Sequence, residues 1–333
     1  MGNLYVSEQG ARLEREYDRI LVAKDNSVLL EAPIIKISGI VLVGRIGITT
    51  PALHLLLERG IPLVFLNRHG EFLGRLSGDS SSNTNLKRAQ YRRDGQRKFC
   101  LQVACAMASG KIWNCRVRCL RIAAATDNPV AEKAAKRLKD ILDALPGKAS
   151  LASVRAQEAQ ASRVYFGVIR THLNQAWKFP SRKRRPPPDP VNVLLSATYT
   201  LLTEAVYSAI TVVGLDPYCG FYHTERPGRP ALVLDLMEEF RPLIADSVVL
   251  TLINKRILTP QDFHPGNTDR PVILSPDGYK KVLQEFGDRL RETVTVPRLN
   301  HRTNYHRLLE IQARELAHTI QGQNDGYEPF RSR

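Results

Sequence analysis

The N-terminal quarter of the chain alternates short apolar runs with polar turns, a pattern typical of β-strands. One helix interrupts the strands, because Thr49 or Thr50 can cap it and Pro51 suits its first turn. We therefore predict a small β-domain for residues 1–80. Its expected strands are Asn3 to Val6, Arg19 to Val22, Ser27 to Glu31, Lys36 to Val43, Pro62 to Phe65 and Glu71 to Leu76.

The pattern changes after the polar segment at residues 78–83, where apolar residues begin to recur at helical spacing. We predict a linker at residues 81–86 and an all-α domain at residues 87–333, so the fold class is α+β. A loop at residues 179–190 interrupts the helices, because its prolines cannot continue a helix and its four consecutive basic residues repel one another. The expected helices are 85–125 (with breaks near 95 and 110), 131–145, 150–172, 191–213, 233–254, 276–293 and 298–322.

The net charge of +15 in 333 residues points to an anionic partner, with DNA or RNA first. A membrane is disfavoured, because the chain has no basic amphipathic helix with aromatic anchors and no apolar run long enough to span a bilayer. The first 13 residues do not resemble a signal peptide, and five cysteines favour reduced thiols in the cytoplasm. Cys115 and Cys119 stand four apart on an expected helix, but without a second ligand pair a zinc site is disfavoured.

Basic residues recur along the first expected helices with only Asp94 among them. Neutralising phosphates with such residues makes binding strongly dependent on salt. The alternative is an ordinary solvated helix face, as is usual for charge runs. The candidates for nucleic-acid contact are Arg88, Arg92 and Arg93, continued by Lys111, with Arg182, Lys183, Arg184 and Arg185 on the proline-rich loop.

A small set of acidic and imidazole residues could bind a divalent ion. Asp235 and Glu238 are three residues apart on an expected helix and therefore share a face. A cation would relieve the repulsion between them, although a solvated acidic turn paired with Arg241 or Arg256 explains them equally well. His223 lies between aromatic residues and could be either a metal ligand or a half-buried histidine satisfied by backbone. Phosphate-loop, HExxH and GxSxG motifs are missing from the sequence, which disfavours the enzyme classes that they mark.

Three segments have the most specific pattern: residues 189–202 (DPVNVLLSATYTLL), 214–223 (GLDPYCGFYH) and 235–242 (DLMEEFRP). Residues 39–44, 50–53, 60–66 and 86–91 give weaker support. Together these segments resemble the CRISPR-associated integrase and endonuclease family, the Cas "one" proteins of spacer acquisition, and their order and sequences are similar to those of subtype I-C members. The resemblance runs nearly end to end.

The resemblance implies a metal site made of a glutamate, a histidine and a third carboxylate, which fall on Glu158, His223 and Glu238. Asp235 would lie beside the site. Nothing in the residues themselves selects Glu158 from the other helical glutamates, and alanines at 156 and 159 replace glycines that the family commonly has there.

The implied activity is insertion of prespacer DNA into the CRISPR array by attack of a 3′-hydroxyl on a phosphodiester at the repeat, with Mg²⁺ or Mn²⁺ as cofactor. The implied partners are DNA, a second copy of the chain in a homodimer and the Cas "two" protein. Two alternatives stay open at this point. One is a metal-dependent structure-specific DNA nuclease without an integration role, and the other is a catalytically silent DNA-binding scaffold.

Overall fold

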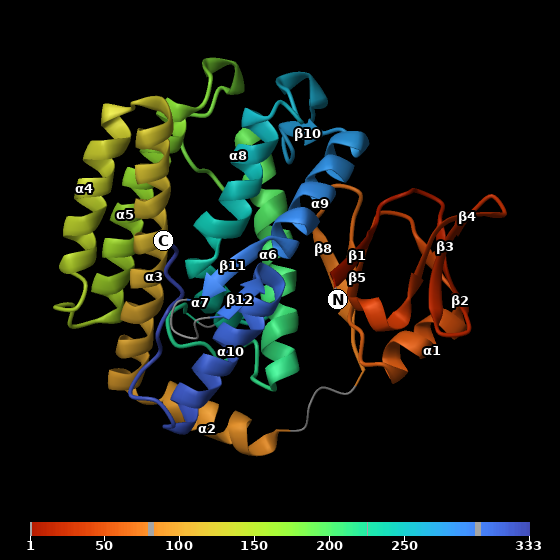
Figure 1. The fold of residues 1–333 in the computed structure, drawn as a ribbon, viewed down its shortest axis with the longest axis horizontal. Helices are drawn as coiled ribbons and strands as arrows, with labels where there is room; N and C mark the ends of the chain where they lie inside the picture. The colour runs from red at the N-terminus through yellow and green to blue at the C-terminus, as the bar shows by residue number, and fades with distance from the viewer. Residues whose placement is uncertain (1, 79–82, 225, 297–300) are drawn as a thin grey trace.

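This computed structural model describes residues 2–78, 83–224, 226–296 and 301–333. Its N-terminal part consists of two four-stranded sheets, one α-helix and a short 3-10 helix (Figure 1). The first sheet has the order β1-β5-β7-β8, with β1, β5 and β7 parallel and β8 antiparallel to β7. The second sheet has the order β4-β3-β2-β6. The elements are β1 (Gly2–Val6), β2 (Arg12–Glu16), β3 (Arg19–Lys24), β4 (Ser27–Pro33), β5 (Ile37–Val43), β6 (Gly47–Ile48), α1 (Thr50–Glu58), β7 (Leu63–Leu66) and β8 (Phe72–Leu76).

Strand β5 joins the two halves of the molecule, because both of its faces are buried. Ile40 and Leu42 pack into the core of the N-terminal part, whereas Val41 and Val43 belong to the large core of the helical part. A strand buried on both faces is expected to be largely apolar, as residues 37–43 are apart from Ser38. The first sheet is thus a layer between the second sheet with α1 and the helices.

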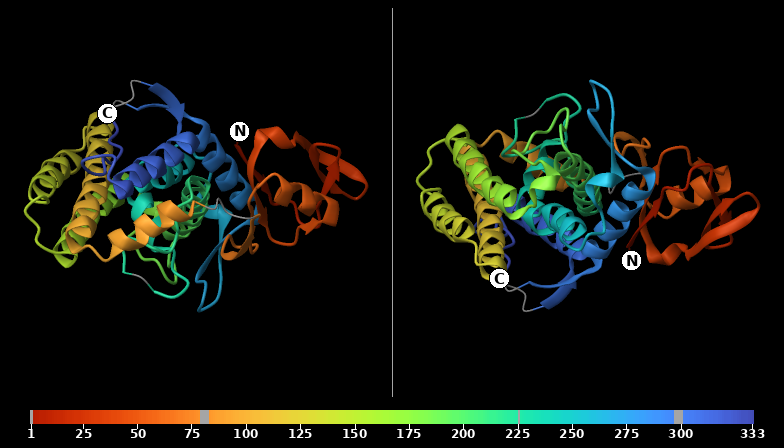
Figure 2. Two further views of the ribbon diagram at one scale, coloured as in Figure 1. Left: turned by 90° about the horizontal axis from the view of Figure 1, so that it is seen from below. Right: turned by 90° about the horizontal axis from the view of Figure 1, so that it is seen from above.

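The helical part confirms most of the expected helices. Figures 1 and 2 show α3, α4 and α5 at the end of the molecule far from the N-terminal part, with α6 in the interior. Gly95 separates α2 from α3 as predicted, but α3 continues through Gly110. The helices are α2 (Thr84–Asp94), α3 (Arg97–Thr126), α4 (Pro129–Asp143), α5 (Leu151–His172), α6 (Pro190–Val213), α7 (Ala231–Leu236), α8 (Asp246–Asn254), α9 (Pro276–Arg291) and α10 (Tyr305–Gln321).

Two expectations for this part of the chain are corrected. It is not all-α, because β9 (Phe263–Pro265) pairs with β10 (Val272–Leu274) and β11 (Thr293–Val296) pairs with β12 (His301–Asn304). The last helix begins at Tyr305, since β12 occupies residues 301–304; residues 297–300, where its start was expected, lie outside the described residues. Residues 81 and 82 of the expected linker also lie outside them, and α2 already begins at Thr84.

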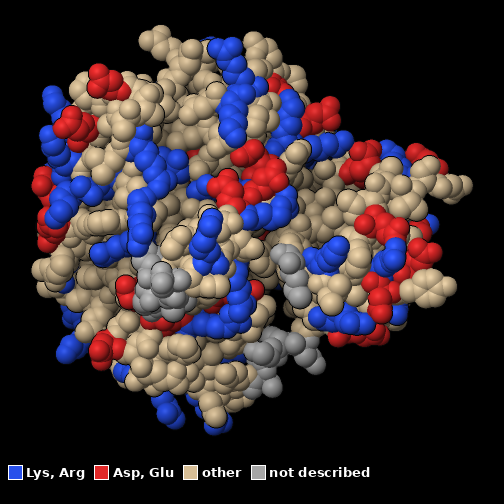
Figure 3. Space-filling view, in the orientation of Figure 1, with Lys and Arg blue, Asp and Glu red and all other residues tan. Residues whose placement is uncertain are grey.

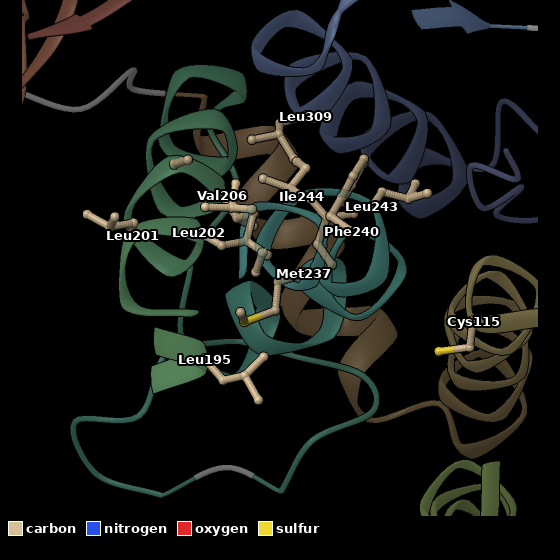
Figure 4. Packing of buried hydrophobic residues seen from close by; sticks show 14 of the residues in the cluster. Cys115, Leu195, Leu201, Leu202, Val206, Met237, Phe240, Leu243, Ile244 and Leu309 are labelled. Atoms are coloured by element: carbon tan, nitrogen blue, oxygen red, sulfur yellow. The ribbon is translucent and has the colours of Figure 1, made fainter. Parts of the chain in front are cut away.

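The segment expected as one helix at residues 233–254 is divided into four pieces. α7 is followed by a 3-10 helix (Met237–Glu239), a π-helix (Arg241–Ala245) and α8. Pro242 has no amide hydrogen to donate, which accounts for the altered hydrogen bonding around it. Figure 4 shows Met237, Phe240 and Ile244 of this segment packed against α6. The segment is therefore anchored through its apolar face, and its acidic residues point elsewhere.

Helix α6 is long and apolar enough to cross a membrane, but 61% of its most apolar window is buried inside the protein. It packs against α10, α8 and the π-helix. It is therefore a core helix.

Candidate metal centre and nucleic-acid interface

Glu158, His223 and Glu238 come from separate elements of the helical part and lie together beside α3. Glu158 is on α5, His223 is in the loop after α6, and Glu238 is in the 3-10 helix after α7. His223 Nε2 is 3.5 Å from Glu238 Oε1. The ammonium of Lys111, on α3, contacts the carboxylates of both Glu158 and Glu238. The structure therefore brings the three residues into one cluster and adds a lysine to it.

Asp235 fixes the orientation of the His223 ring. Its Oδ1 accepts a hydrogen bond from the backbone N–H of His223 at 2.7 Å and lies 2.8 Å from Nδ1 of the same residue. Its Oδ2 accepts the backbone N–H groups of Phe221 at 2.6 Å and Tyr222 at 2.9 Å. Because a carboxylate oxygen in contact with Nδ1 pairs with an N–H there, a neutral His223 would carry its ring proton on Nδ1 and present the Nε2 lone pair to a ligand. A carboxylate behind the imidazole is the usual support for a metal-binding histidine.

The loop that carries His223 approaches α7 closely because residue 220 is glycine. A Cβ at Gly220 would lie 2.8 Å from Asp235 Oδ2 and 2.8 Å from the carbonyl carbon of Ala231. Arg155, one turn before Glu158 on α5, donates to the carbonyl oxygen of Tyr222. The loop is therefore held from both sides, by α7 and by α5.

Two cations balance the glutamates of the cluster. Arg241 Nη1 is 2.8 Å from Glu238 Oε1, and Lys111 Nζ is 2.7 Å from Glu238 Oε2. Burial alone would raise the pKa of Glu238, but the positive charges of Arg241 and Lys111 outweigh it and lower the pKa to about 2. Glu238 is therefore ionised at neutral pH although its side chain is only 3% exposed.

The donor set fits a divalent ion, although the lysine lies where the ion would bind. Glu238 Oε2 is buried and accepts no well-directed hydrogen bond, and His223 Nε2 faces the same carboxylate. Two carboxylates and one imidazole suit Mg²⁺ or Mn²⁺ when water and substrate oxygens complete the shell. In the part of the chain that the structure describes, no three acidic, imidazole or thiol groups already surround a common point as a bound ion requires. The Lys111 ammonium lies between the two glutamates instead.

Glu239 faces away from this cluster and holds the C-terminal tail. It accepts hydrogen bonds from the hydroxyl of Tyr327 and the backbone N–H of Phe330, both at 2.6 Å. Burial raises the pKa of Glu239 to about 8, in spite of these donors. Asn114 on α3 donates to the carbonyl oxygens of both Glu239 and Phe330. These hydrogen bonds hold the 3-10 helix between α3 and the C-terminal tail, with Glu238 directed toward Lys111.

The interpretation of these acids as a solvated turn is wrong. Asp235, Glu238 and Glu239 are 0%, 2% and 0% exposed. Arg241, offered as a partner in that interpretation, does pair with Glu238, but the pair is buried. Sequence reasoning placed Lys111 among the surface basic residues, whereas it is 8% exposed and belongs to the acidic cluster. No local signal distinguishes it, because its partners are on two other elements.

The predicted nucleic-acid residues divide into two groups. Arg88 and Arg92 on α2 are exposed, as are residues 183–185. Arg93 instead donates to the carbonyl oxygen of Ile320 and lies over Phe99. Arg182 donates to Asn192 and lies over Tyr199, so it is fastened to α6 and is not part of a free arm.

The net charge is confined to one part of the chain. Residues 1–80 contain nine Lys or Arg and nine Asp or Glu, so the whole excess of +15 lies in residues 81–333. Figure 3 shows Lys and Arg in several groups over the helical part. The anionic partner inferred from the composition is therefore expected on the helical part. Cys115 and Cys119 are buried in α3 and form no disulfide.

Comparison with known proteins shows the family to which the chain belongs. Residues 4–288 match the model of the family described as CRISPR associated protein Cas1. A CRISPR-associated endonuclease Cas1 of Chlorobaculum tepidum is 35% identical over 341 residues, covering 99% of this chain and 98% of that protein. A CRISPR-associated endonuclease Cas1 of Moorella thermoacetica is 34% identical over 339 residues, covering 99% and 98%.

The fold also matches solved structures. A CAS1 protein from Thermotoga maritima superimposes with a TM-score of 0.83 at 22% identity, covering 98% of this chain and 99% of that one. A casposase bound to integration product gives a TM-score of 0.85 at 22% identity, covering 98% and 93%. The family match and the full-length relatives settle the assignment: this chain belongs to the Cas1 family of CRISPR-associated endonucleases.

Proposed function

We propose that this chain is a metal-dependent DNA integrase and endonuclease of CRISPR spacer acquisition, with Glu158, His223 and Glu238 as the ligands of Mg²⁺ or Mn²⁺. The observation that carries the proposal is the convergence of these three side chains, with Asp235 holding His223 so that Nε2 faces Glu238. When bound, the ion would polarise the attacked phosphate and stabilise the charge on the leaving oxygen.

The reaction exchanges one phosphodiester for another. The 3′-hydroxyl oxygen of a prespacer forms a bond to phosphorus at the repeat, and the bond from that phosphorus to the departing 3′-oxygen breaks. Because the broken and formed bonds are of one kind, no nucleotide cofactor has to supply energy. With water in place of the 3′-hydroxyl the same groups would cleave DNA, which accounts for both activities at one site.

The chain's own residues supply positioning and binding in this proposal. Arg241 holds Glu238, and Asp235 holds His223, so both side chains are already oriented before substrate arrives. Arg88, Arg92 and residues 183–185 are exposed and free to meet phosphates. The partners proposed are prespacer and repeat DNA, a second copy of the chain and the Cas2 protein, in the cytoplasm. One structural neighbour is described as a Cas6-RT-Cas1–Cas2 complex. Membership of subtype I-C rests on the sequences of residues 189–202, 214–223 and 235–242 and stays a prediction.

Strand transfer by purified protein tests the chemistry. A prespacer duplex and a plasmid with a CRISPR repeat are incubated with Mn²⁺ and Cas2, and joined and nicked products are separated. We expect joined products from the wild type and none from His223→Ala, which should still bind DNA. Full joining by His223→Ala would contradict the site. If the wild type cleaves DNA without joining it, the result favours a structure-specific nuclease. If the wild type gives no product at all, the result favours a catalytically silent scaffold.

The salt dependence of DNA binding tests the interface. The double variant Arg88→Ala/Arg92→Ala should reduce the slope of log K against log salt by roughly 1.8, about 0.9 for each phosphate that the protein no longer neutralises. Arg93→Ala is the matched control on the same helix, because Arg93 is engaged with Ile320 and Phe99. An unchanged slope in the double variant would remove α2 from the interface.

A further inference from the structure

The most unusual group in the cluster is the buried ammonium of Lys111. It lies in the middle of α3 and contacts the carboxylates of Glu158 and Glu238 at once. Its side chain is 10% exposed, and those of its partners are 19% and 3% exposed. Two carboxylates this close repel one another unless a cation lies between them. In this structure the cation between them is part of the chain itself.

The charges of the two glutamates are already balanced by two cations. Glu158 and Glu238 contribute two negative charges, and Lys111 and Arg241 contribute two positive charges. Of the two glutamates, Arg241 pairs with Glu238, on Oε1, whereas Lys111 contacts Oε2 of Glu238 and also Glu158. The two cations therefore differ in place: Arg241 supports one glutamate from the side, and Lys111 lies between both.

We propose that Lys111 is a positioning residue that occupies the place of the divalent ion in the metal-free protein, and that the ion binds by displacing its ammonium. This inference rests on the function proposed above. The displacement is physically simple, because a lysine carries its charge at the end of a flexible four-carbon stem. The tip can withdraw while α3 keeps the Cα in place. Lys111 thereby keeps Glu158 and Glu238 together without metal and lowers the affinity of the site for metal.

Binding of Mn²⁺ to the purified full-length protein, measured by isothermal titration calorimetry, tests the competition. Lys111→Met removes the charge and nearly conserves the length of the side chain. The variant should bind Mn²⁺ on the order of tenfold more tightly or better, because a unit positive charge a few ångströms from the site has been removed. Lys111→Arg keeps the cation and should bind with an affinity close to that of the wild type.

The control for net charge is Lys136→Met. Lys136 is an exposed residue of α4 that pairs with Glu132 one turn away. This variant loses the same charge on the surface and should bind Mn²⁺ like the wild type. Without metal, Lys111→Met should melt at a lower temperature than the wild type, and saturating Mn²⁺ should raise its Tm by more.

The outcomes separate this inference from the proposed function. Equal or weaker Mn²⁺ binding by Lys111→Met would overturn the competition, because a lysine with a purely structural role leaves a disordered, weaker site when it is removed. If Lys111→Met does not fold, Mn²⁺ binding by Lys111→Gln gives the same test, because glutamine also lacks the positive charge. If Glu238→Gln leaves Mn²⁺ binding unchanged, the ion does not bind at this cluster and the proposed function itself fails.

Discussion

Replacement of Asp235 by asparagine should release the loop that carries His223. Each oxygen of the carboxylate accepts two N–H groups, which come from Phe221, Tyr222 and His223. In asparagine an N–H₂ group replaces one of the two carboxylate oxygens. The two N–H groups that donated to that oxygen then face another donor and lose their hydrogen bonds. Hydrogen bonds to a charged group contribute about 1.5–3 kcal/mol each. The loss of two such bonds therefore costs about 3–6 kcal/mol, much of the stability of a typical domain.

Urea unfolding of the metal-free protein measures this cost, and hydrogen exchange of the peptide containing residues 220–223 shows whether the loss is local. Asp216→Asn is the matched control, because Asp216 lies in the same loop, is partly exposed and accepts one backbone N–H, from Tyr218, and the hydroxyl of Tyr91, which can accept from an amide instead. It should cost less than about 1.5 kcal/mol. If Asp235→Asn costs no more than this control and leaves amide protection at 220–223 unchanged, Asp235 does not hold the loop.

Three further changes test other contacts. Gly220→Ala should cost about 1–3 kcal/mol and reduce strand transfer, because its Cβ would lie 2.8 Å from Asp235 Oδ2; unchanged urea stability would refute the close approach. Burial lowers the pKa of His306, which contacts Ser38 across the two parts, so the unfolded chain binds the proton more readily. Stability should therefore fall as the pH drops below about 6.5, by at most about 1.4 kcal/mol per pH unit, and His306→Gln should remove this component in urea titrations at several pH values. Arg75→Met should cost about 3–5 kcal/mol in urea unfolding, because it leaves the buried Glu204 carboxylate unpaired. The double variant Arg75→Met/Glu204→Gln should recover part of this stability, and an equal loss in the single and double variants would contradict the ion pair.

Much of the secondary structure could be predicted because its signals are local. The side chain of Thr49 caps α1 next to Pro51, and residues 37–43, rich in β-branched side chains, form strand β5. Local signals misled at residues 233–254, where the apolar spacing is helical throughout. There Pro242 and tertiary packing against α6 divide the segment into different helical forms. The hairpins β9–β10 and β11–β12 were missed because their strands are only three or four residues long.

The candidate site was less accessible to sequence reasoning. Asp235 and Glu238 stand out through their spacing, but only the family resemblance singles out Glu158, since nothing near it on α5 marks it as different. Lys111 was grouped with surface residues because a helix of mixed composition does not show which face is buried. The role of Lys111 depends on contacts with α5 and the 3-10 helix. Glu158 on α5, for example, is 47 residues away in the sequence. Contacts of this kind become visible only when the chain is folded.

Crystals soaked in Mn²⁺ and measured at the manganese absorption edge test the central claim most directly. The account predicts an anomalous peak bound by Glu158, His223 Nε2 and Glu238 at about 2.1–2.3 Å, with the Lys111 ammonium withdrawn from between the two glutamates. An anomalous map with no peak at these three side chains, and with Lys111 still bridging Glu158 and Glu238, would contradict it.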